Sequence, residues 1–414
     1  MGRFTTRTNP AVDNFVASQL EQITDGVCAV MGRDLEAIVL TGGFGRGEGS
    51  VAVAADGGMH IVNDYDLEVV YREQWGRRLS KLFSHIKYRT RLHRLAETLA
   101  RALQVKQVDL GLRGSRSYSI TTPVRLADFD VKYGHQLLWG SRDPVTVMPD
   151  FQPEDIQPFE GTWLLRNRGN GLLLGRLYLT PGQLPAHKRE YFFIEVTKAI
   201  LAMGDALFIG AGKYRASYAH RARHIAGVIP QSCPYRNNLI GLYGLAASYK
   251  LEPGPGPGPE IYLDMGPEDL WRYLDKLYLA VFLEYESARL ARRFSSVVEY
   301  GNWVLPRHVP SGKMELLQRL KHAVIRATSG IPPAAISLRF GYDKAVTVLF
   351  TFLLLDCYAG CDEGAWRMLE RLIDQDIAGS PNRLDTLAAL TREFLLLTHP
   401  SGEQGRFLLH EYRR

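Results

Sequence analysis

Residues 38–49 read I-V-L-T-G-G-F-G-R-G-E-G, and after an insert residues 63–71 read N-D-Y-D-L-E-V-V-Y. The first segment is typical of an apolar strand that runs into a glycine-rich turn. The second is typical of a strand that carries Asp64 and Asp66 two residues apart. Because successive side chains of a strand point to opposite faces, both carboxylates lie on one face. Two carboxylates beside exposed backbone N–H groups predict a site for a divalent cation and phosphate.

A third carboxylate follows in residues 105–112, V-K-Q-V-D-L-G-L, where Asp109 is central to an apolar strand. Nucleotidyl transfer uses two metal ions, and three carboxylates on neighbouring strands suffice to bind them. We expect Asp64 and Asp66 to bridge both ions, and Asp109 to complete one site and help to take the proton of the nucleophile. The alternative is that Asp109 forms an ion pair with Lys106 or Arg113.

The glycine turn supplies the expected phosphate contacts. The backbone amides of Gly42 and Gly43, together with a side chain such as Arg46 or Ser50, are expected to hold the β- and γ-phosphates of a nucleotide. Glu68 shares the face of the two aspartates, and we interpret it as a partner of Arg46 or Arg72.

In this order, the glycine pair, the aspartate-x-aspartate strand and the later aspartate resemble the DNA polymerase β-type nucleotidyltransferase superfamily. The segment T-G-G-F-G-R-G-E-G is similar to the G-G-[YF]-G-R-G-E signature of protein-PII uridylyltransferases. The resemblance covers about residues 36–140. It implies that Asp64, Asp66 and Asp109 bind Mg²⁺, that a nucleoside triphosphate is the co-substrate, and that pyrophosphate is released. The residues implied to match the signature are Gly42, Gly43, Arg46 and Glu48.

The sequence departs from the family pattern in three respects, which limit the members of the superfamily that it can resemble. The stretch between Gly43 and Asp64 is about twice the usual family length, and a hairpin over residues 51–61 with Asp56-Gly57-Gly58 at its tip accounts for the excess. No adjacent His-Asp pair is present, which excludes the hydrolase half of the bifunctional uridylyltransferases. The arginine-aspartate motifs of CCA-adding enzymes are also absent, which disfavours synthesis of tRNA ends.

The composition is that of an ordinary globular protein. The 414 residues are 46% hydrophobic and 23% charged, with a net charge of +6, which suits anionic ligands without indicating nucleic acid. The four cysteines are too scattered for a disulfide framework and are expected to be reduced thiols, which favours a cytoplasmic location. The polar first ten residues lack the apolar core of a signal peptide, and no apolar run is long enough to span a bilayer.

Patterning along the chain predicts an α+β fold, with a nucleotidyltransferase head that contains a small mixed sheet flanked by helices, followed by an all-helical body. The expected divisions are a head over residues 1–150, a helical domain over 155–250, a proline- and glycine-rich linker over 251–260, and a second helical domain over 261–414. Helical periodicity is expected at 10–31, 75–103, 163–177, 187–210, 214–228, 238–249, 267–294, 313–327, 344–355, 363–374 and 384–397. Strands are expected at 37–41, 64–71, 105–112 and 135–139.

Two predicted helices outside the glycine turn have polar surfaces that could contribute to function. The polar residues of helix 188–205 form one stripe, which either faces solvent or borders a cleft where Lys198 contacts the triphosphate. The helix over residues 77–101 carries eight basic residues and Glu97 alone, so it presents either a solvated face or a docking surface for an anionic partner. Arg215-x4-His220 matches a short ribonuclease-like motif, but a pattern this short arises by chance.

The sequence therefore predicts an enzyme that moves a nucleoside monophosphate from a nucleoside triphosphate, with ATP favoured, to a hydroxyl or amine. Two Mg²⁺ ions are expected, with Mn²⁺ as a substitute. The acceptor is left open between a small molecule and a protein side chain, and RNA is a less favoured partner. The alternative is a catalytically inactive nucleotide- or RNA-binding module that uses the basic helix over residues 77–101. The base, the acceptor and the oligomeric state are not determined by the sequence.

Overall fold

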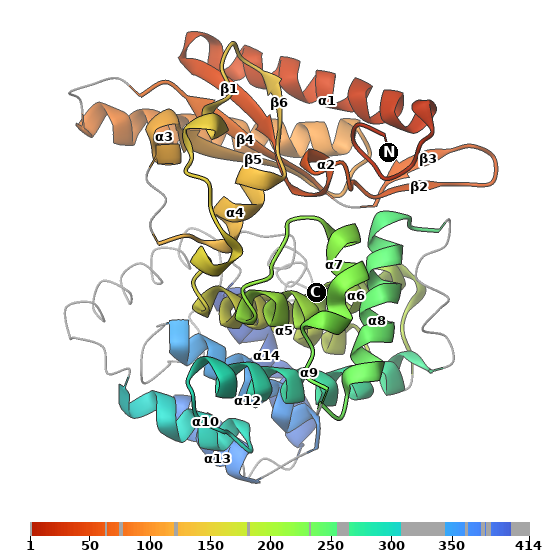
Figure 1. Cartoon of the computed structure of the whole chain (residues 1–414), viewed down its shortest axis with the longest axis vertical. Helices are drawn as coiled ribbons and strands as arrows, with labels where there is room; N and C mark the ends of the chain where they lie inside the picture. The colour runs from red at the N-terminus through yellow and green to blue at the C-terminus, as the bar shows by residue number, and fades with distance from the viewer. Residues whose placement is uncertain are drawn as a thin grey trace. The chain divides into compact units, whose positions relative to one another are not determined.

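The computed structural model of the chain contains a sheet-bearing unit and a helical unit, which are described separately (Figure 1). The first, here called the head, comprises Met1–Gln157, Ala211–Pro230 and Tyr243–Gly256. The second, here called the body, comprises Pro158–Gly210, Gln231–Leu242 and Pro257–Arg414. The structure describes residues 2–62, 64–73, 78–119, 123–179, 183–231, 233–254, 265–307, 344–360, 363–373, 377 and 382–398.

The head is built on a four-stranded mixed sheet with the strand order β5-β4-β1-β6. Strand β4 runs parallel to β5, and β1 runs antiparallel to both β4 and β6. A separate antiparallel hairpin, β2–β3, forms where the sequence predicts an insert. The strands are β1 (Leu35–Leu40), β2 (Val51–Val53), β3 (Met59–Ile61), β4 (Tyr65–Tyr71), β5 (Val108–Gly114) and β6 (Gln136–Trp139).

One face of this sheet forms the hydrophobic core of the head. Tyr65, Leu67 and Val69 of β4 pack with the apolar stripe of α1 (Pro10–Met31), which runs through Val16 and Ile23. Apolar residues of α3 (Arg78–Ala102) complete the same cluster, so two helices cover this face (Figure 1). Burial of one face leaves the alternate residues of β4 and β5 on the other face, which therefore carries the acidic side chains.

The helices of the head come from distant parts of the chain. They are α1 (Pro10–Met31), α2 (Gly42–Gly45), α3 (Arg78–Ala102), α4 (Leu126–Tyr133) and α7 (Tyr218–His224). Helix α8 (Arg236–Leu251) passes from the body into the head between Leu242 and Tyr243. The segments 211–230 and 243–256 thus return to the head after the chain has entered the body.

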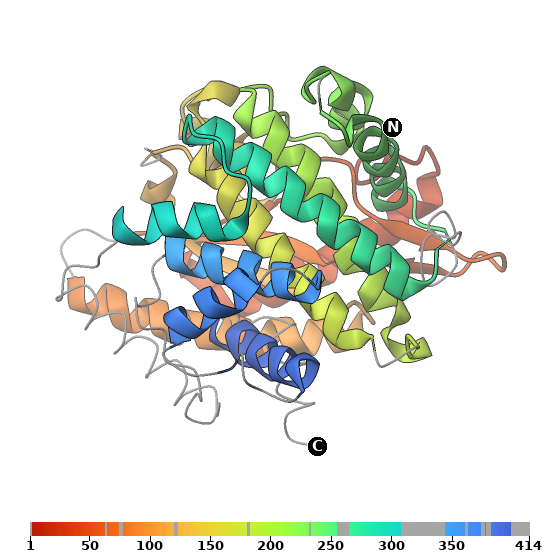
Figure 2. The same cartoon turned by 90° about the horizontal axis from the view of Figure 1, so that it is seen from below.

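The body is helical in its described parts. Helices α9 and α12 both pack along α5 (Figure 2). The helices are α5 (Phe159–Tyr178), α6 (Ala186–Gly210), α9 (Pro267–Arg289), α10 (Val297–Val304), α12 (Lys344–Tyr358), α13 (Glu363–Ile373) and α14 (Arg383–Thr398). None of the helices in the described ranges is long and apolar enough to cross a membrane.

The predicted fold class is confirmed, because a mixed sheet flanked by helices precedes a helical body. The expected division near residue 150 lies close to the observed passage from Gln157 to Pro158. The predicted domains are continuous in sequence, whereas segments 211–230 and 243–256 belong to the head. From Pro158 on, the other described residues of both predicted helical domains belong to one body. The predicted helix over 313–327 and residues 255–260 of the predicted linker lie outside the described residues. Helices α4 and α10 were not predicted, because each is only eight residues long.

Candidate nucleotide and metal site

Asp66 and Asp109 lie side by side on the face of the sheet opposite the hydrophobic core of the head. They are register partners across the parallel β4–β5 ladder, so their side chains point the same way from strands spaced about 4.8 Å apart. Asp64 directly precedes β4 and is partly buried. The structure therefore places the three carboxylates that the sequence singles out within electrostatic reach of one another.

The glycine turn packs directly against this pair. Gly42 begins α2 with a φ of +63°, and a Cβ atom at this position would overlap the carboxylate of Asp66. The backbone N–H of Thr41 donates to the carbonyl oxygen of Asp66 at 2.9 Å, which ties the turn to β4. Only glycine combines this left-handed backbone with so close an approach. Gly42 and Gly43 occupy the first turn of α2, where backbone N–H groups have no acceptor within the helix.

The charges of the three carboxylates act on one another. Withdrawal from water, together with repulsion from Asp64 and Asp109, raises the pKa of Asp66 to about 7. Partial burial and the charge of Asp64 also raise the pKa of Asp109. Lys250 and Arg46 oppose the rise at Asp66, which places both cations in the electrostatic neighbourhood of the site. The site thus concentrates negative charge that nearby cations compensate only in part.

These oxygens are the donors that Mg²⁺ prefers, and a bound cation would relieve their repulsion. The residues present fit a divalent ion in charge and in donor type. Among the residues that the structure describes, no three His, Cys, Asp or Glu side chains converge closely enough to form a ready-made metal cage. The three aspartates therefore interact through their charges, and Asp66 and Asp109 also share one face of the sheet.

Arg46 and Glu48 of the glycine segment form an internal network. The Nε atom of Arg46 lies 3.7 Å from a carboxylate oxygen of Glu48, and both side chains are largely buried. Glu48 accepts hydrogen bonds from Ser217 Oγ at 2.6 Å and from the backbone N–H groups of Tyr218 and Ala219 at 2.8 and 3.0 Å. Glu48 therefore caps α7, and the signature residues join the turn to a helix far along the chain.

The same network reaches α4. The hydroxyl of Tyr214 donates to both carboxylate oxygens of Asp130, at 3.1 and 3.3 Å. The charges of Arg46 and Arg221 act on Asp130, and the guanidinium of Arg46 also lies over the ring of Tyr218 at 5.4 Å. Arg46 is expected from the sequence to hold phosphate, and the structure places it in this ion network beside Asp66.

Ser50 and Lys250 join the start of β2 to the end of α8. The hydroxyl of Ser50, which the sequence assigns to phosphate binding, is buried and donates to the backbone carbonyl of Lys250. This contact fixes Lys250 in the head, where its charge acts on Asp66. Lys250 was missed by sequence reasoning because it lies in an ordinary helical pattern far along the chain from the aspartates.

Lys198, the remaining predicted phosphate contact, lies on α6 in the body. Its ammonium is 3.7 Å from Glu195 Oε1, and its side chain is 36% exposed. Glu195, Asp205 and Lys188 of the same predicted polar stripe are buried. The stripe therefore is not a simple solvent-facing surface. The contact of Lys198 with a triphosphate stays a prediction.

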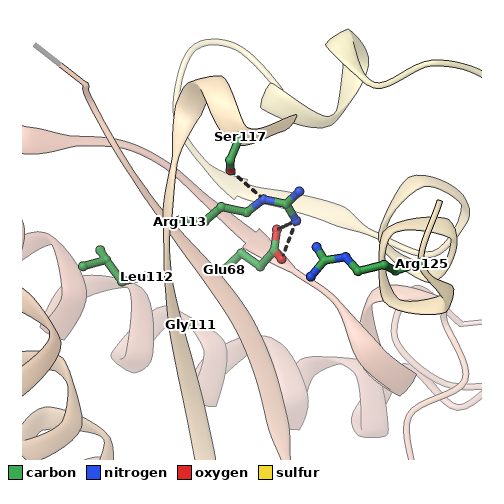
Figure 3. Close-up of a pocket in the computed structure, with 6 residues that line it drawn as sticks. All are labelled: Glu68, Gly111, Leu112, Arg113, Ser117 and Arg125. Atoms are coloured by element: carbon green, nitrogen blue, oxygen red, sulfur yellow. Dashed lines mark hydrogen bonds and ion pairs between the residues drawn. The ribbon is translucent and has the colours of Figure 1, made fainter. Parts of the chain in front are cut away.

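Glu68 lines a cavity of about 470 Å³ that lies on the acidic face (Figure 3). The predicted pairing of Glu68 with Arg46 or Arg72 is wrong. Arg113 Nη1 donates to the two carboxylate oxygens of Glu68 at 2.9 and 3.3 Å, because Arg113 and Glu68 project from the same face of neighbouring strands. The same guanidinium was the alternative partner of Asp109, and its ion pairs are instead with Glu68 and Asp128.

The basic helix of the alternative hypothesis is α3. Several of its arginines are exposed. Glu97, one turn from His93, lies 3.6 Å from the imidazole of that residue at an exposed position. The exposed arginines are Arg89, Arg91, Arg94 and Arg101. The side chains of residues 77–87 lie outside the described set.

Comparisons with known proteins leave this site without an assigned relative. No family model matches the chain, and no curated protein sequence matches it. The solved structure of spectinomycin adenyltransferase AAD(9) from Enterococcus faecialis with ATP and spectinomycin aligns with 63% of this chain and 98% of that chain. The identity is 11% and the TM-score is 0.34, a similarity too low to support an argument about fold or function.

Proposed function

We propose that the head is a metal-dependent nucleotidyltransferase, which moves a nucleoside monophosphate from a nucleoside triphosphate to a hydroxyl or amine with release of pyrophosphate. The pairing of Asp66 with Asp109 beside the left-handed turn at Gly42 carries this proposal. In this arrangement, two carboxylates that can bind a metal ion lie next to a glycine backbone whose N–H groups can bind phosphate.

Asp64, Asp66 and Asp109 would hold Mg²⁺, or Mn²⁺ in its place, and the bound metal would neutralise charge on the phosphate oxygens. The residues of the chain supply the remaining functions. The glycine turn orients the phosphates through the amides of Gly42 and Gly43, while Asp109 accepts the proton that leaves the attacking hydroxyl or amine. Lys250 and Arg46 contribute positive charge beside Asp66, which favours binding of the polyanionic co-substrate.

The nucleotide and the acceptor belong to the same proposal. ATP is the expected co-substrate, and a thermal-shift screen of the four nucleoside triphosphates with Mg²⁺ identifies the base that raises the melting temperature most. A small molecule and a protein side chain are both compatible with the carboxylate site alone. The similarity of the glycine segment to uridylyltransferases does not choose between them.

Incubation with nucleoside triphosphates labelled at the α-phosphate tests the reaction. We expect label transfer and pyrophosphate release in the wild type, and a loss of roughly a hundredfold or more in Asp66→Asn. Asp56→Asn, which removes a charge from the exposed tip of the β2–β3 hairpin, is the matched control. Salt-sensitive RNA binding without turnover, weakened by Arg91→Gln on α3, would instead support the binding module.

A further inference from the structure

The cavity beside Glu68 continues the carboxylate site along the sheet. Glu68 pairs with Gly111 one step beyond the pair Asp66–Asp109, since side chains on one face repeat every second residue. At the usual rise of a strand this step is about 7 Å. Gly42 contacts Asp66 from the opposite direction, because β1 is antiparallel to β4 and the turn lies at the start of β4. The turn, the carboxylates and the cavity therefore follow one another along β4.

Gly111 lines the cavity and lies next to Asp109 on the same face of β5. Arg113 is its other neighbour on this face, and Gly111 is exposed. A Cβ atom at this position would meet one atom within 4 Å, the carbonyl oxygen of Leu67 at 3.6 Å. The missing side chain thus leaves open space on the sheet surface where a larger residue would separate the two regions.

The cavity wall carries two arginines that buried Asp128 holds in place. Asp128 accepts from Arg125 Nε at 2.8 Å and Arg125 Nη2 at 3.0 Å, and from Arg113 Nη2 at 3.3 Å. Arg113 is further fixed by Glu68 and by Ser117, to which its Nε donates at 2.9 Å (Figure 3). Guanidinium groups oriented in this way bind anions with little further loss of side-chain entropy.

Arg125 differs from Arg113 in its exposure. The side chain of Arg125 is 62% exposed, whereas that of Arg113 is 15% exposed. Figure 3 shows the guanidinium of Arg125 directed toward Glu68 and Arg113 across the cavity. Arg125 is therefore the guanidinium that an incoming molecule reaches first.

The in-line geometry of nucleotidyl transfer indicates which reactant the cavity would bind. The leaving pyrophosphate and the attacking atom lie on opposite sides of the α-phosphorus. If the glycine turn holds the leaving phosphates, the attacking atom comes from the side of Glu68 and Gly111. A volume of about 470 Å³ is within the range of small-molecule sites.

We propose that this cavity binds the acceptor, and that the acceptor is a small molecule with a carboxylate or phosphate group that Arg125 recognises. The proposal rests on the proposed nucleotidyl transfer. The acceptor hydroxyl oxygen forms a bond to the α-phosphorus while the bond from the α-phosphorus to the bridging oxygen breaks. Pyrophosphate leaves with the electron pair of that bond, and the hydroxyl proton passes to Asp109.

Calorimetric titration of the full chain tests the proposal, with Mg²⁺ and an α,β-methylene analogue of ATP already bound. The probes are glycerol, glycerate and glycerol 3-phosphate, which share a hydroxyl and differ in charge. We expect at least one anionic probe to bind about tenfold tighter than glycerol, and Arg125→Gln to remove the difference. Arg89→Gln on α3 is the matched control. Equal binding of the three probes, or a preference that survives in Arg125→Gln, overturns the proposal.

Gly111→Val provides an independent test, because it fills the open space at this position without changing any charge. We expect all three probes to bind about tenfold more weakly, while binding of the ATP analogue and the melting temperature stay unchanged. Unchanged binding of the probes contradicts the assignment of the cavity. Failure of the analogue to bind wild type would refute the proposed function itself, and this proposal with it. If the ATP analogue binds but the three probes bind equally, only the proposed acceptor site is refuted.

Discussion

At the scale of single residues, Gly42 allows the glycine turn to pack directly against the carboxylates. Its left-handed φ and the lack of a side chain allow the backbone to lie against Asp66. Burial of Asp66, followed by repulsion from Asp64 and Asp109, raises the pKa of Asp66 and is the electrostatic cost of the arrangement. Such unfavourable crowding is common at functional sites, where a ligand relieves it.

Gly42→Ala should destabilise the chain and also weaken nucleotide binding. The left-handed conformation costs a non-glycine residue about 1–2 kcal/mol, and the added Cβ would displace the carboxylate of Asp66. Gly57→Ala is the matched control, because Gly57 has a φ of +85° at the hairpin tip and no atom within 4 Å of the added Cβ. Urea denaturation should show a loss in both variants, and titration with ATP and Mg²⁺ a loss in Gly42→Ala alone. Equal nucleotide affinity in the two variants would contradict the role of Gly42.

At the scale of elements, Glu48 joins the glycine segment to α7. Its carboxylate accepts three hydrogen bonds at the start of α7 and lies beside Arg46, although 169 residues separate Glu48 from Ser217. Hydrogen bonds to a carboxylate are stronger than those between neutral groups. The contact orders both the end of the glycine segment and the helix that returns to the head.

Glu48→Ala should lower the free energy of unfolding by about 3 kcal/mol or more, because it removes the ion-pair partner of buried Arg46 and the acceptor of the first N–H groups of α7. Glu21→Ala, at an exposed position on α1, removes the same charge and should change stability by less than about 0.5 kcal/mol. Urea denaturation compares the two. A similar small change in both variants would show that the cap does not stabilise the head.

At the scale of the whole molecule, both units contain buried acids that are paired with donors, as Glu286 is with Arg289 in the body. The head pairs its buried acids with arginines, tyrosines and helix N–H groups. In the body, Asp275 on α9 is fully buried, and no described residue donates a hydrogen bond to either carboxylate oxygen. Burial and the charge of Asp356 on α12 raise the pKa of Asp275 well above its ordinary value.

Asp275→Asn should raise the melting temperature at pH 8, and the gain should shrink toward pH 5. The folded chain keeps a proton on Asp275 that the unfolded chain releases above about pH 4, so stability falls as pH rises from there through the folded-state pKa. The amide of the variant does not titrate and removes this dependence. Glu284→Gln, at an exposed position on α9, is the control. A gain that does not change with pH would show that Asp275 carries no such penalty.

The sequence alone determined the strands of the head, its two long helices and the identity of its acidic residues. Alternation in β4, the apolar stripe of α1 and the glycine turn are local patterns, because the period of each element is set by backbone geometry. They predicted that Asp64 and Asp66 share a face, and the apolar surroundings of Asp109 predicted its strand. Short helices such as α4 carry too few residues for a reliable pattern.

Only the tertiary structure decided the other partners. The capping of α7 by Glu48, the position of Lys250 and the ion pair of Glu68 with Arg113 all join residues distant in sequence. A charged side chain has many potential partners of opposite sign, and its sequence neighbours do not indicate which one the fold brings within reach. Chain topology makes that choice, because strand order and the returning segments place side chains together only after the core has formed.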